Sequence, residues 1–442
     1  MDAVDHFGTE KISRILLKIA PPVMLAQLIQ ALYNIVDSLF IGQYAESGLT
    51  ALSIIYPVQL LMIAFAVGTG VGLNTCMSAR LGLGYRDEAD QYAGVGTPLI
   101  IVVWLPFALA GWFLMPAYAA MSSQSPAVIQ DVIAYGRIVC LFSFGLFLES
   151  VWTKVLQAEG NMKTPMYAQI FGALTNIVLD PILIFGLFGL PAMGITGAAI
   201  ATVSGQIVAA AVVFHRGYRR PPALSTYKRR IKKIFRLGIP SILMQSSYTV
   251  YIFGLNLILS AFSDQAVTVL GLYYKWQTLF NIPFNAMLTC IVPVISFNYA
   301  AGSLRRCKRT LYDSVISGMA FMVVAVLCFM LIPVPLLKVF TSDPAAWEIG
   351  RVAFRLIGTS FLPIVTSLTF PVFFQAVGCS AKSSALTVIR TLVLFVPLGY
   401  LFSRFGLTWF WLTFPVTEII TSLVGYVFYR QFLKNPYPKM MP

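Results

Sequence analysis

The chain has 442 residues, of which 58% are hydrophobic and only 11% charged, and it carries a formal net charge of +14. Soluble proteins have about a quarter charged residues, so this composition, with a mean hydropathy of +0.79, excludes an ordinary soluble domain. It indicates an integral membrane protein.

Long apolar segments recur between short polar breaks. Each is long enough to cross the roughly 30 Å hydrocarbon core of a bilayer as a helix. The sequence therefore predicts an all-α membrane protein whose transmembrane helices lie at residues 14–42, 50–80, 93–116, 127–157, 164–188, 193–215, 234–262, 266–299, 311–335, 346–377, 383–403 and 408–432.

The basic residues lie in alternate loops of this pattern, which argues against nucleic-acid binding as the reason for the net charge. They gather at 216–236 and 305–309, whereas the loops around Glu46, Asp264 and Asp343 are acidic or nearly uncharged. Because Lys and Arg are enriched in cytoplasmic loops, both termini are predicted to be cytoplasmic, as an even number of spans requires. Phosphate binding by the basic segment is an alternative, but topology and contact with anionic lipid headgroups explain it without a further partner.

The two halves of the chain resemble each other at a constant offset. Ser125-Pro126 matches Asp343-Pro344, and in both pairs a helix N-cap residue precedes a proline at the first helical position. Each half holds an even number of spans, so both halves start on the cytoplasmic side. This predicts a parallel repeat whose axis lies along the membrane normal.

The repeat divides the chain into two six-helix lobes. We predict the N-terminal lobe at 1–215 and the C-terminal lobe at 237–442, with a basic cytoplasmic linker at 216–236. Two lobes related by a pseudo-twofold axis leave a central cleft, and rocking of one lobe against the other gives alternating access.

The fifth apolar segment carries Asn176 and Asp180, whose four-residue spacing places both on one helix face. An ionisable side chain at such a depth costs roughly 2.5 to 3.5 kcal/mol on insertion scales, so it marks a functional site by default. Asp180 is therefore a candidate carrier of an ion or proton, with Asn176 as a neutral oxygen ligand. Pro181 follows directly and is a point where the helix can bend. The alternative is that Asp180 only satisfies backbone groups that Pro181 leaves free.

Two other helices place polar groups at a similar depth. Asp37 lies near the outer end of the first helix, and Tyr33 precedes it by one turn on the same face. Thr202 follows a face of small residues at 194–201, which lets another helix approach closely. Two carboxylates close together in an apolar chamber cannot both be ionised cheaply, so a cation or proton is expected between them. Three helices could therefore bring Asp37, Asn176, Asp180 and Thr202 to one layer in the outer part of the first lobe, which we call the predicted cation site.

The second lobe lacks this cluster. Leu255 stands where the repeat would place Asp37, and the buried ionisable candidates of this lobe are Lys275, Arg390 and Glu418. Lys275 lies between aromatic residues, a setting that suits a cation–π contact or a place in the cleft, with snorkelling to the interface as an equal alternative. The residues predicted to line the chamber are Tyr33, Tyr135, Gln245, Tyr274 and Lys275.

Several classes of function find no support in the sequence. The six cysteines are scattered without a CxxC pair, which favours neither zinc nor disulfides. The histidines, His6 and His215, lie near the cytoplasmic surface, and no HExxH motif or Ser–His pair is apparent, so we do not expect an enzyme. Without a GxxxxGK[ST] motif, transport must be coupled to a gradient. The polar start MDAVDHFGTEKISR is not typical of a cleavable signal peptide.

Four motifs in order resemble the multidrug and toxic compound extrusion (MATE) family of transporters, and the resemblance covers essentially the whole chain. They are YNIVDSLFIG around Asp37, QAEGNMKTPM at 157–166, Asn176-x-x-x-Asp180-Pro181, and GxxGAAxAT at 194–202. The resemblance implies that the predicted cation site binds a coupling proton or sodium ion and that Tyr33 lines the same chamber. It also implies export of bulky, often cationic and aromatic compounds in exchange for that ion.

One branch of this family carries a second cation site, made by a glutamate in helix 7 and an acid in helix 10. Here Gln245 stands nearest the helix 7 position, and 351–377 contains no acid. The chain is therefore more similar to the DinF-like and MepA-like exporters, whose acids lie in the first lobe.

The function predicted from the sequence is a secondary active antiporter of the cell membrane, exporting drugs in exchange for protons or sodium. The alternative is a flippase for a lipid-linked precursor, which would line the cleft with several arginines, whereas buried basic residues are few here. We expect no cofactor beyond the coupling ion. The expected partners are a drug-like small molecule and membrane lipid, without nucleic acid, and the protein is expected to act as a monomer.

Overall fold

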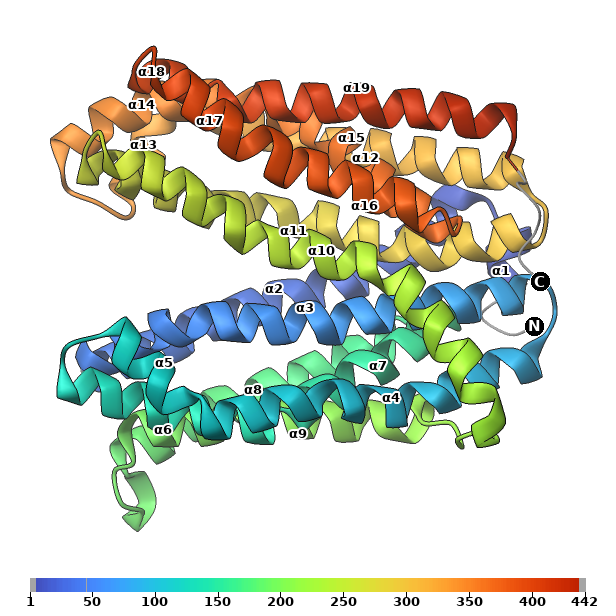
Figure 1. The fold of residues 1–442 in the computed structure, drawn as a ribbon, viewed down its shortest axis with the longest axis horizontal. Coiled ribbons are helices and arrows are strands. Elements are labelled where there is room, and N and C mark those ends of the chain that lie inside the picture. Colours follow the sequence, from blue (N-terminus) through green and yellow to red (C-terminus); the bar gives the residue numbers. More distant parts are fainter. Residues whose placement is uncertain (1–4, 45, 437–442) are drawn as a thin grey trace. The chain divides into compact units, whose positions relative to one another are not determined.

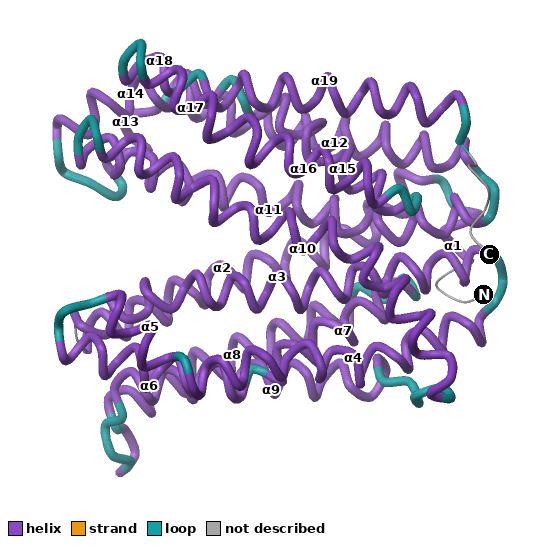
Figure 2. The backbone as a smooth tube through the Cα atoms, in the orientation of Figure 1, coloured by secondary structure: helices purple, strands orange, loops and turns teal. Residues whose placement is uncertain are grey.

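The computed structural model describes residues 5–44 and 46–436, which form helices and loops without a strand (Figure 1, Figure 2). The described chain divides into two compact units. Unit 1 comprises the described residues of Met1–Thr9 and Ile19–Ile242, and unit 2 those of Glu10–Lys18 and Leu243–Pro442. The helices α2 and α10 therefore each contribute to both units.

Unit 1 corresponds to the predicted N-terminal lobe. Its elements are α1 (Asp5–Thr9), most of α2 (Ile12–Tyr44), α3 (Glu46–Gly82), α4 (Arg86–Phe113), α5 (Met115–Ser122), α6 (Pro126–Phe142), α7 (Phe144–Ala158), α8 (Lys163–Phe185), η1 (Leu187–Gly189), α9 (Gly194–Gly217), η2 (Leu224–Thr226) and the first half of α10 (Tyr227–Ser260).

Unit 2 corresponds to the predicted C-terminal lobe. It takes the start of α2 and the second half of α10, followed by α11 (Asp264–Ala300), α12 (Leu304–Leu331), α13 (Pro333–Lys338), α14 (Pro344–Gly358), α15 (Phe361–Ala376), α16 (Ser380–Val388), the π-helix η3 (Ile389–Phe395), α17 (Val396–Ser403), α18 (Leu407–Phe410) and α19 (Thr413–Lys434).

The described helices are sufficient for the predicted number of spans. Ten are long and apolar enough to cross a membrane, and two bent pairs, α6 with α7 and α14 with α15, bring the number to 12 when each pair counts as one span. The prediction of an all-α, polytopic membrane protein is thus confirmed.

The bent pairs correct our expectation of single helices at 127–157 and 346–377, since the pairs bend by 41° and 51°. A side-chain hydroxyl bonds to the backbone at each break. Ser143 Oγ donates to the carbonyl of Cys140 at 3.0 Å, and Thr359 Oγ1 donates to that of Leu356 at 2.6 Å. Such side-chain bonds compete with the helical backbone ladder and bend the helix.

The basic segment 216–236, predicted as the linker, makes several contacts with unit 1. Arg219 forms ion pairs with Asp90 at 3.0 Å and Glu159 at 2.6 Å, and Arg230 donates to Gln91. From Tyr227 onward the segment is already helical. These ion pairs and this hydrogen bond hold the linker against unit 1. The division between the units falls after Ile242.

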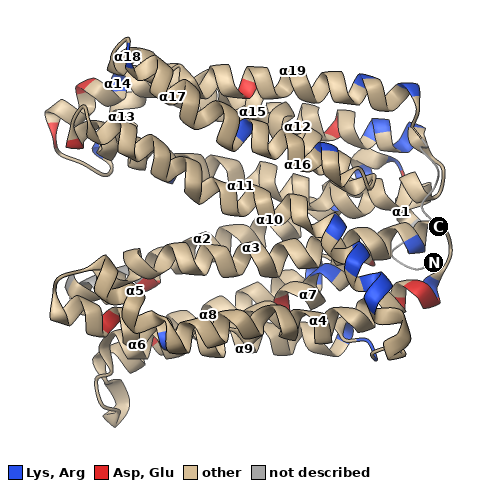
Figure 3. Ribbon diagram, viewed as in Figure 1, with Lys and Arg blue, Asp and Glu red and all other residues tan. Residues whose placement is uncertain are grey.

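Charged residues divide unit 1 into two ends. Lys and Arg gather where α3 ends and where α4 and α10 begin (Figure 3). We call this the linker end of unit 1. The opposite end, where α2 finishes at Tyr44 and α9 starts at Gly194, is called the far end.

Glycines allow α8 and α9 to lie against each other in unit 1 (Figure 1). A Cβ on Gly205 would lie 2.6 Å from the carbonyl oxygen of Gly172, and one on Gly197 would lie 2.6 Å from that of Leu183. Real Cβ atoms do not approach backbone this closely, so both positions require glycine. The close approach brings the polar residues of α8 within reach of those of α9.

We predict that Gly205→Ala lowers the stability of the protein by about 1 to 3 kcal/mol, because the added methyl group forces the two helices apart. Gly271→Ala is the matched control, since a Cβ on this helical glycine of α11 meets nothing within 4 Å. The control should be neutral or stabilise the protein by up to about 1 kcal/mol, because Ala favours the helix over Gly. Thermal unfolding of the purified proteins in detergent measures both, and equal melting temperatures for the two variants would contradict the prediction.

Candidate cation site

The centre of the site is the pair Asn176 and Asp180 on α8. Both side chains are buried, at 2% and 0% exposure, and Asn176 Nδ2 donates to Asp180 Oδ1 at 3.3 Å. The helix continues through Pro181 to Phe185 without an interruption. Because proline has no backbone N–H, one helical hydrogen bond is missing at this position. Pro181 therefore remains the point of α8 where we expect the helix to bend.

Asp37 of α2 completes a carboxylate pair with Asp180. Its side chain is 8% exposed, and the two carboxyl groups are direct neighbours. Among the described residues no group of three His, Cys, Asp or Glu side chains converges, so this site holds two carboxylates and neutral oxygens. Such a donor set suits a proton or a hard monovalent cation better than a transition metal.

Four oxygen atoms of this site are buried without a hydrogen-bond donor from the described part of the chain. They belong to the four residues that the sequence predicted, and the atoms are Asp37 Oδ1, Asn176 Oδ1, Asp180 Oδ2 and Thr202 Oγ1. A buried acceptor without a partner costs roughly 1 to 3 kcal/mol, and more when it is charged. A bound cation, or a proton between the carboxylates, would satisfy these atoms.

Two tyrosines surround the site. The hydroxyl of Tyr135, on α6, accepts a hydrogen bond from Gln59 Nε2 at 3.3 Å and lies close to Thr202. Tyr33, one turn before Asp37 on α2, lies within electrostatic range of Asp37 and Asp180. Both predicted chamber residues of unit 1 therefore adjoin the carboxylate pair.

The sequence reasoning missed two polar residues near this site. Gln206 follows Thr202 by one turn of α9, and its Oε1 is also buried without a hydrogen-bond partner among the described residues. The four-residue spacing from Thr202 is a signal that could have identified it. The second residue is Gln59 of α3, which donates to the hydroxyl of Tyr135.

Glu149, on α7, is a third carboxylate in the interior of unit 1. It is buried at 7% exposure and accepts hydrogen bonds from Thr153 Oγ1 at 2.6 Å and Gln169 Nε2 at 3.2 Å. Lys154, on the same helix, donates to Gln157 Oε1 at 2.8 Å. Glu149 is thus a satisfied interior carboxylate, within electrostatic range of Tyr33.

The predicted chamber residues of unit 2 lie in different surroundings. Tyr274 is partly buried among aromatic rings, with the ring of Tyr248 at 6.0 Å, while Gln245 is half-buried on α10. Lys275 is exposed, and its Nζ lies 4.9 Å from the centre of the Phe340 ring. Of the alternatives for Lys275, the structure shows the cation–π contact.

Arg390 and Glu418 form a buried ion pair in unit 2. Arg390 Nε and Nη2 donate to the Glu418 carboxylate at 2.6 to 3.1 Å, and Ser367 Oγ also donates to it. Arg390 lies in the π-helical segment η3, the kind of local distortion that repositions a side chain. The sequence named both residues without a role, and the structure shows that each neutralises the other.

These observations define a polytopic α-helical membrane protein with an interior, unneutralised carboxylate site, which is the design of a transporter rather than of a structural protein. The sequence profile of the MatE family matches residues 22–182 and 240–401. The chain therefore belongs to the MatE family and is a MATE family transporter, as the sequence motifs predicted.

Several characterised proteins are similar to the chain along its whole length. The FAD transporter of Shewanella oneidensis is 24% identical over 426 residues, which cover 94% of this chain and 94% of that protein. The probable multidrug resistance protein NorM of Thermotoga maritima is 23% identical, covering 95% and 92%. The multidrug export protein MepA of Staphylococcus haemolyticus is 24% identical, covering 91% and 90%.

Solved structures share the fold. A structure described as the outward-facing conformation of a multidrug resistance MATE family transporter of the MOP superfamily aligns with a TM-score of 0.91 at 23% identity, covering 100% of this chain and 99% of that one. A MOP superfamily transporter from Pyrococcus furiosus aligns with a TM-score of 0.89 at 23% identity, covering 98% of each chain. At this identity the likeness establishes the fold and nothing finer.

We predict that Arg390→Met destabilises the protein by about 3 to 5 kcal/mol, because it leaves Glu418 buried without a counter-ion. The double variant Arg390→Met/Glu418→Met should recover most of this loss, since Ser367 Oγ also bonds to the carbonyl of Ile364. Thermal unfolding of both variants measures the difference. A double variant as unstable as the single one would show that the ion pair is not the reason for the loss.

Proposed function

We propose that this protein is a secondary active antiporter that exports bulky cationic or aromatic compounds in exchange for protons or sodium ions. In this proposal Asp37, Asn176, Asp180 and Thr202 bind the coupling ion. The observation that carries it is the set of four buried oxygens without hydrogen-bond donors in the described chain, which lie on α2, α8 and α9.

The charge balance of the site supports coupling to a cation. Neither Asp37 nor Asp180 forms an ion pair with Lys or Arg in the described chain, so an exchangeable cation or proton is the partner that can neutralise them. Neutralising the pair lets α2 and α8 pack together, whereas releasing the cation leaves two like charges side by side. The cation and the drug need only favour different states of unit 1 for their transport to be coupled.

The charge of unit 2 favours a cationic or neutral aromatic substrate over a polyanion. Arg390, which could otherwise attract an anion, is held by Glu418. Tyrosine and phenylalanine rings pack together in the interior of this unit, where Tyr251 stacks on Phe395 at 4.6 Å. Tyr251 and Phe395 are 2% and 1% exposed, so these rings form part of the core of unit 2 around the ion pair. The same neutralisation of Arg390 disfavours the alternative function as a flippase of anionic lipid-linked precursors.

We predict that Asp37→Asn and Asp180→Asn each reduce gradient-driven efflux at least about tenfold, a loss of about 1.4 kcal/mol or more in cation binding. Asparagine keeps the size and hydrogen bonding of the side chain but removes the charge that holds the cation. Ethidium efflux from reconstituted vesicles, under separately imposed proton and sodium gradients, measures the effect. The vesicles must contain equal amounts of folded protein. Efflux at the wild-type rate in both variants would refute the coupling site.

The same assay includes flavin adenine dinucleotide as a second substrate, because one relative is named an FAD transporter. Efflux of this dinucleotide without efflux of ethidium would overturn the proposed substrate class while leaving the coupling site intact.

Thr202→Val distinguishes the two coupling ions, because it removes one oxygen and preserves the shape of the side chain. A sodium ion uses that hydroxyl as a ligand, so sodium coupling predicts that the half-saturating sodium concentration rises about 5- to 30-fold, equivalent to about 1 to 2 kcal/mol for the lost ligand. A proton is held by the carboxylates themselves, so proton coupling predicts a change of less than about twofold. The measurement is the half-saturating concentration of external sodium, and of external protons, for efflux by the wild type and by Thr202→Val.

A further inference from the structure

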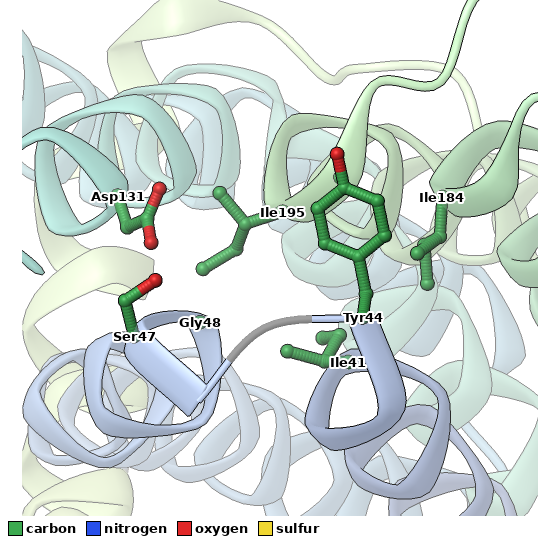
Figure 4. Close-up of a pocket in the computed structure, with 8 residues that line it drawn as sticks. Ile41, Tyr44, Ser47, Gly48, Asp131, Ile184 and Ile195 are labelled. Atoms are coloured by element: carbon green, nitrogen blue, oxygen red, sulfur yellow. The ribbon is translucent and has the colours of Figure 1, made fainter. Parts of the chain in front are cut away.

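A cavity of about 130 Å³ lies at the far end of unit 1 (Figure 4). Its walls come from the last turns of α2 and α8 and from the first turns of α3 and α9, with α6 closing one side. At roughly 30 Å³ for each water molecule, it has room for about four waters, or for a small cation that keeps part of its hydration shell.

The cavity lies directly beyond the candidate cation site. Ile41 follows Asp37 by four residues on α2, and Ile184 follows Asp180 by four residues on α8, and both isoleucines line the cavity. A four-residue step is one helical turn on nearly the same face. The cavity is therefore one turn nearer the far end of unit 1 than the carboxylate pair.

One ionisable acid faces this space. The carboxylate of Asp131, on α6, and the hydroxyl of Ser47, on α3, point toward each other across the cavity (Figure 4). Asp131 is partly exposed and forms no ion pair or hydrogen bond within the described chain. Its negative charge is therefore available to a cation that arrives from solution.

Apolar side chains separate the cavity from the carboxylate pair. Ile41, Ile184 and Ile195 are 2%, 0% and 7% exposed and belong to the hydrophobic core of unit 1. A Cβ on Gly48 would lie 3.0 Å from Ile41 and 3.8 Å from Ile195, so these side chains converge beside the cavity. A charged ion does not cross such a layer without a rearrangement of α2 and α8.

We propose that the Asp131 cavity is a loading site for the coupling cation, where Asp131 and Ser47 hold a hydrated monovalent cation before it passes the Ile41–Ile184–Ile195 layer. The proposal rests on the proposed antiport function and adds to it a second, outer site. In this arrangement Asp131 raises the local cation concentration, because a negative charge beside a concave, low-dielectric wall focuses the field on the cavity. The isoleucine layer keeps the ion there until α2 and α8 separate.

A labelling experiment tests the site without using transport. Ser47→Cys is reacted with a cationic methanethiosulfonate (trimethylammonioethyl) and with an anionic one (sulfonatoethyl), in full-length protein whose partly exposed Cys328 and Cys379 are replaced by serine. We expect the cationic reagent to react faster. Asp131→Asn should reduce this preference by about threefold or more, because it removes the charge that attracts the reagent. Sodium, with N-methyl-D-glucamine keeping the ionic strength constant, should slow the cationic reagent by competing for the site.

Glu348→Gln is the matched control, because Glu348 is an exposed acid in unit 2 on α14. It should leave the preference unchanged, which separates the local effect of Asp131 from a change in total charge. A preference that Asp131→Asn does not alter, or a cysteine at position 47 that neither reagent reaches, would overturn the proposal.

Exchange kinetics then connect the site to transport. Asp131→Asn should raise the external cation concentration for half-maximal exchange about 3- to 10-fold, and it should lower the rate far less when the cation is saturating. Loss of exchange at all cation concentrations, as expected for Asp37→Asn, would contradict a loading role for Asp131. The labelling result does not depend on transport. The loading site can therefore be refuted while the antiport function stands, and the antiport function can be refuted while the loading site stands.

Discussion

The structure of unit 1 depends on one electrostatic constraint, which is the burial of two neighbouring carboxylates with no basic residue to neutralise them. Placing even one charge at membrane depth costs several kcal/mol. Asp37 and Asp180 come from helices that are distant in sequence, so their proximity is maintained by the surrounding helices rather than by local structure. The glycine contacts between α8 and α9 contribute to this arrangement, because they bring Thr202 toward Asn176 and Asp180. Two like charges side by side repel each other, so this arrangement costs least when one of the two carboxyl groups is neutral.

The two units treat buried charge in opposite ways. In unit 2 the buried acid Glu418 has a tethered cation, since the guanidinium of Arg390 lies against it. In unit 1 no Lys or Arg of the described chain forms an ion pair with Asp37 or Asp180. A permanent ion pair contributes to the structure but cannot respond to a gradient, whereas an exchangeable ion changes the charge of its site whenever it binds or leaves. The two halves of the internal repeat thus differ in how a buried acid is neutralised, and their similar helix patterns do not reveal this difference.

Hydroxyl groups and irregular helices place these charges. Ser143 and Thr359 bond to backbone carbonyls at the break in the fourth span of each half, and Arg390, which pairs with Glu418, lies in a π-helical segment. Apolar isoleucines then separate the carboxylate pair of unit 1 from the cavity at its far end. The buried charged groups of the protein thus lie at irregular helical segments or at places where a few polar side chains interrupt an apolar core.

The sequence alone determined the membrane class, the number of spans, the family and the choice of Asp37, Asn176, Asp180 and Thr202 as one group. These follow from hydropathy, from the high cost of a polar residue in an apolar run and from spacing along a helix, all of which are local properties.

The tertiary structure decided which side chains touch. Arg390 and Glu418 are 28 residues apart and no periodicity pairs them, while Asp131 gains a role only because α6 faces the ends of α2 and α8. The bends at Ser143 and Thr359, the burial of Glu149 and the fastening of Arg219 to unit 1 likewise escaped prediction. Each depends on a hydrogen bond or ion pair whose partner is set by how the helices pack, and a single sequence does not contain that geometry in its local pattern.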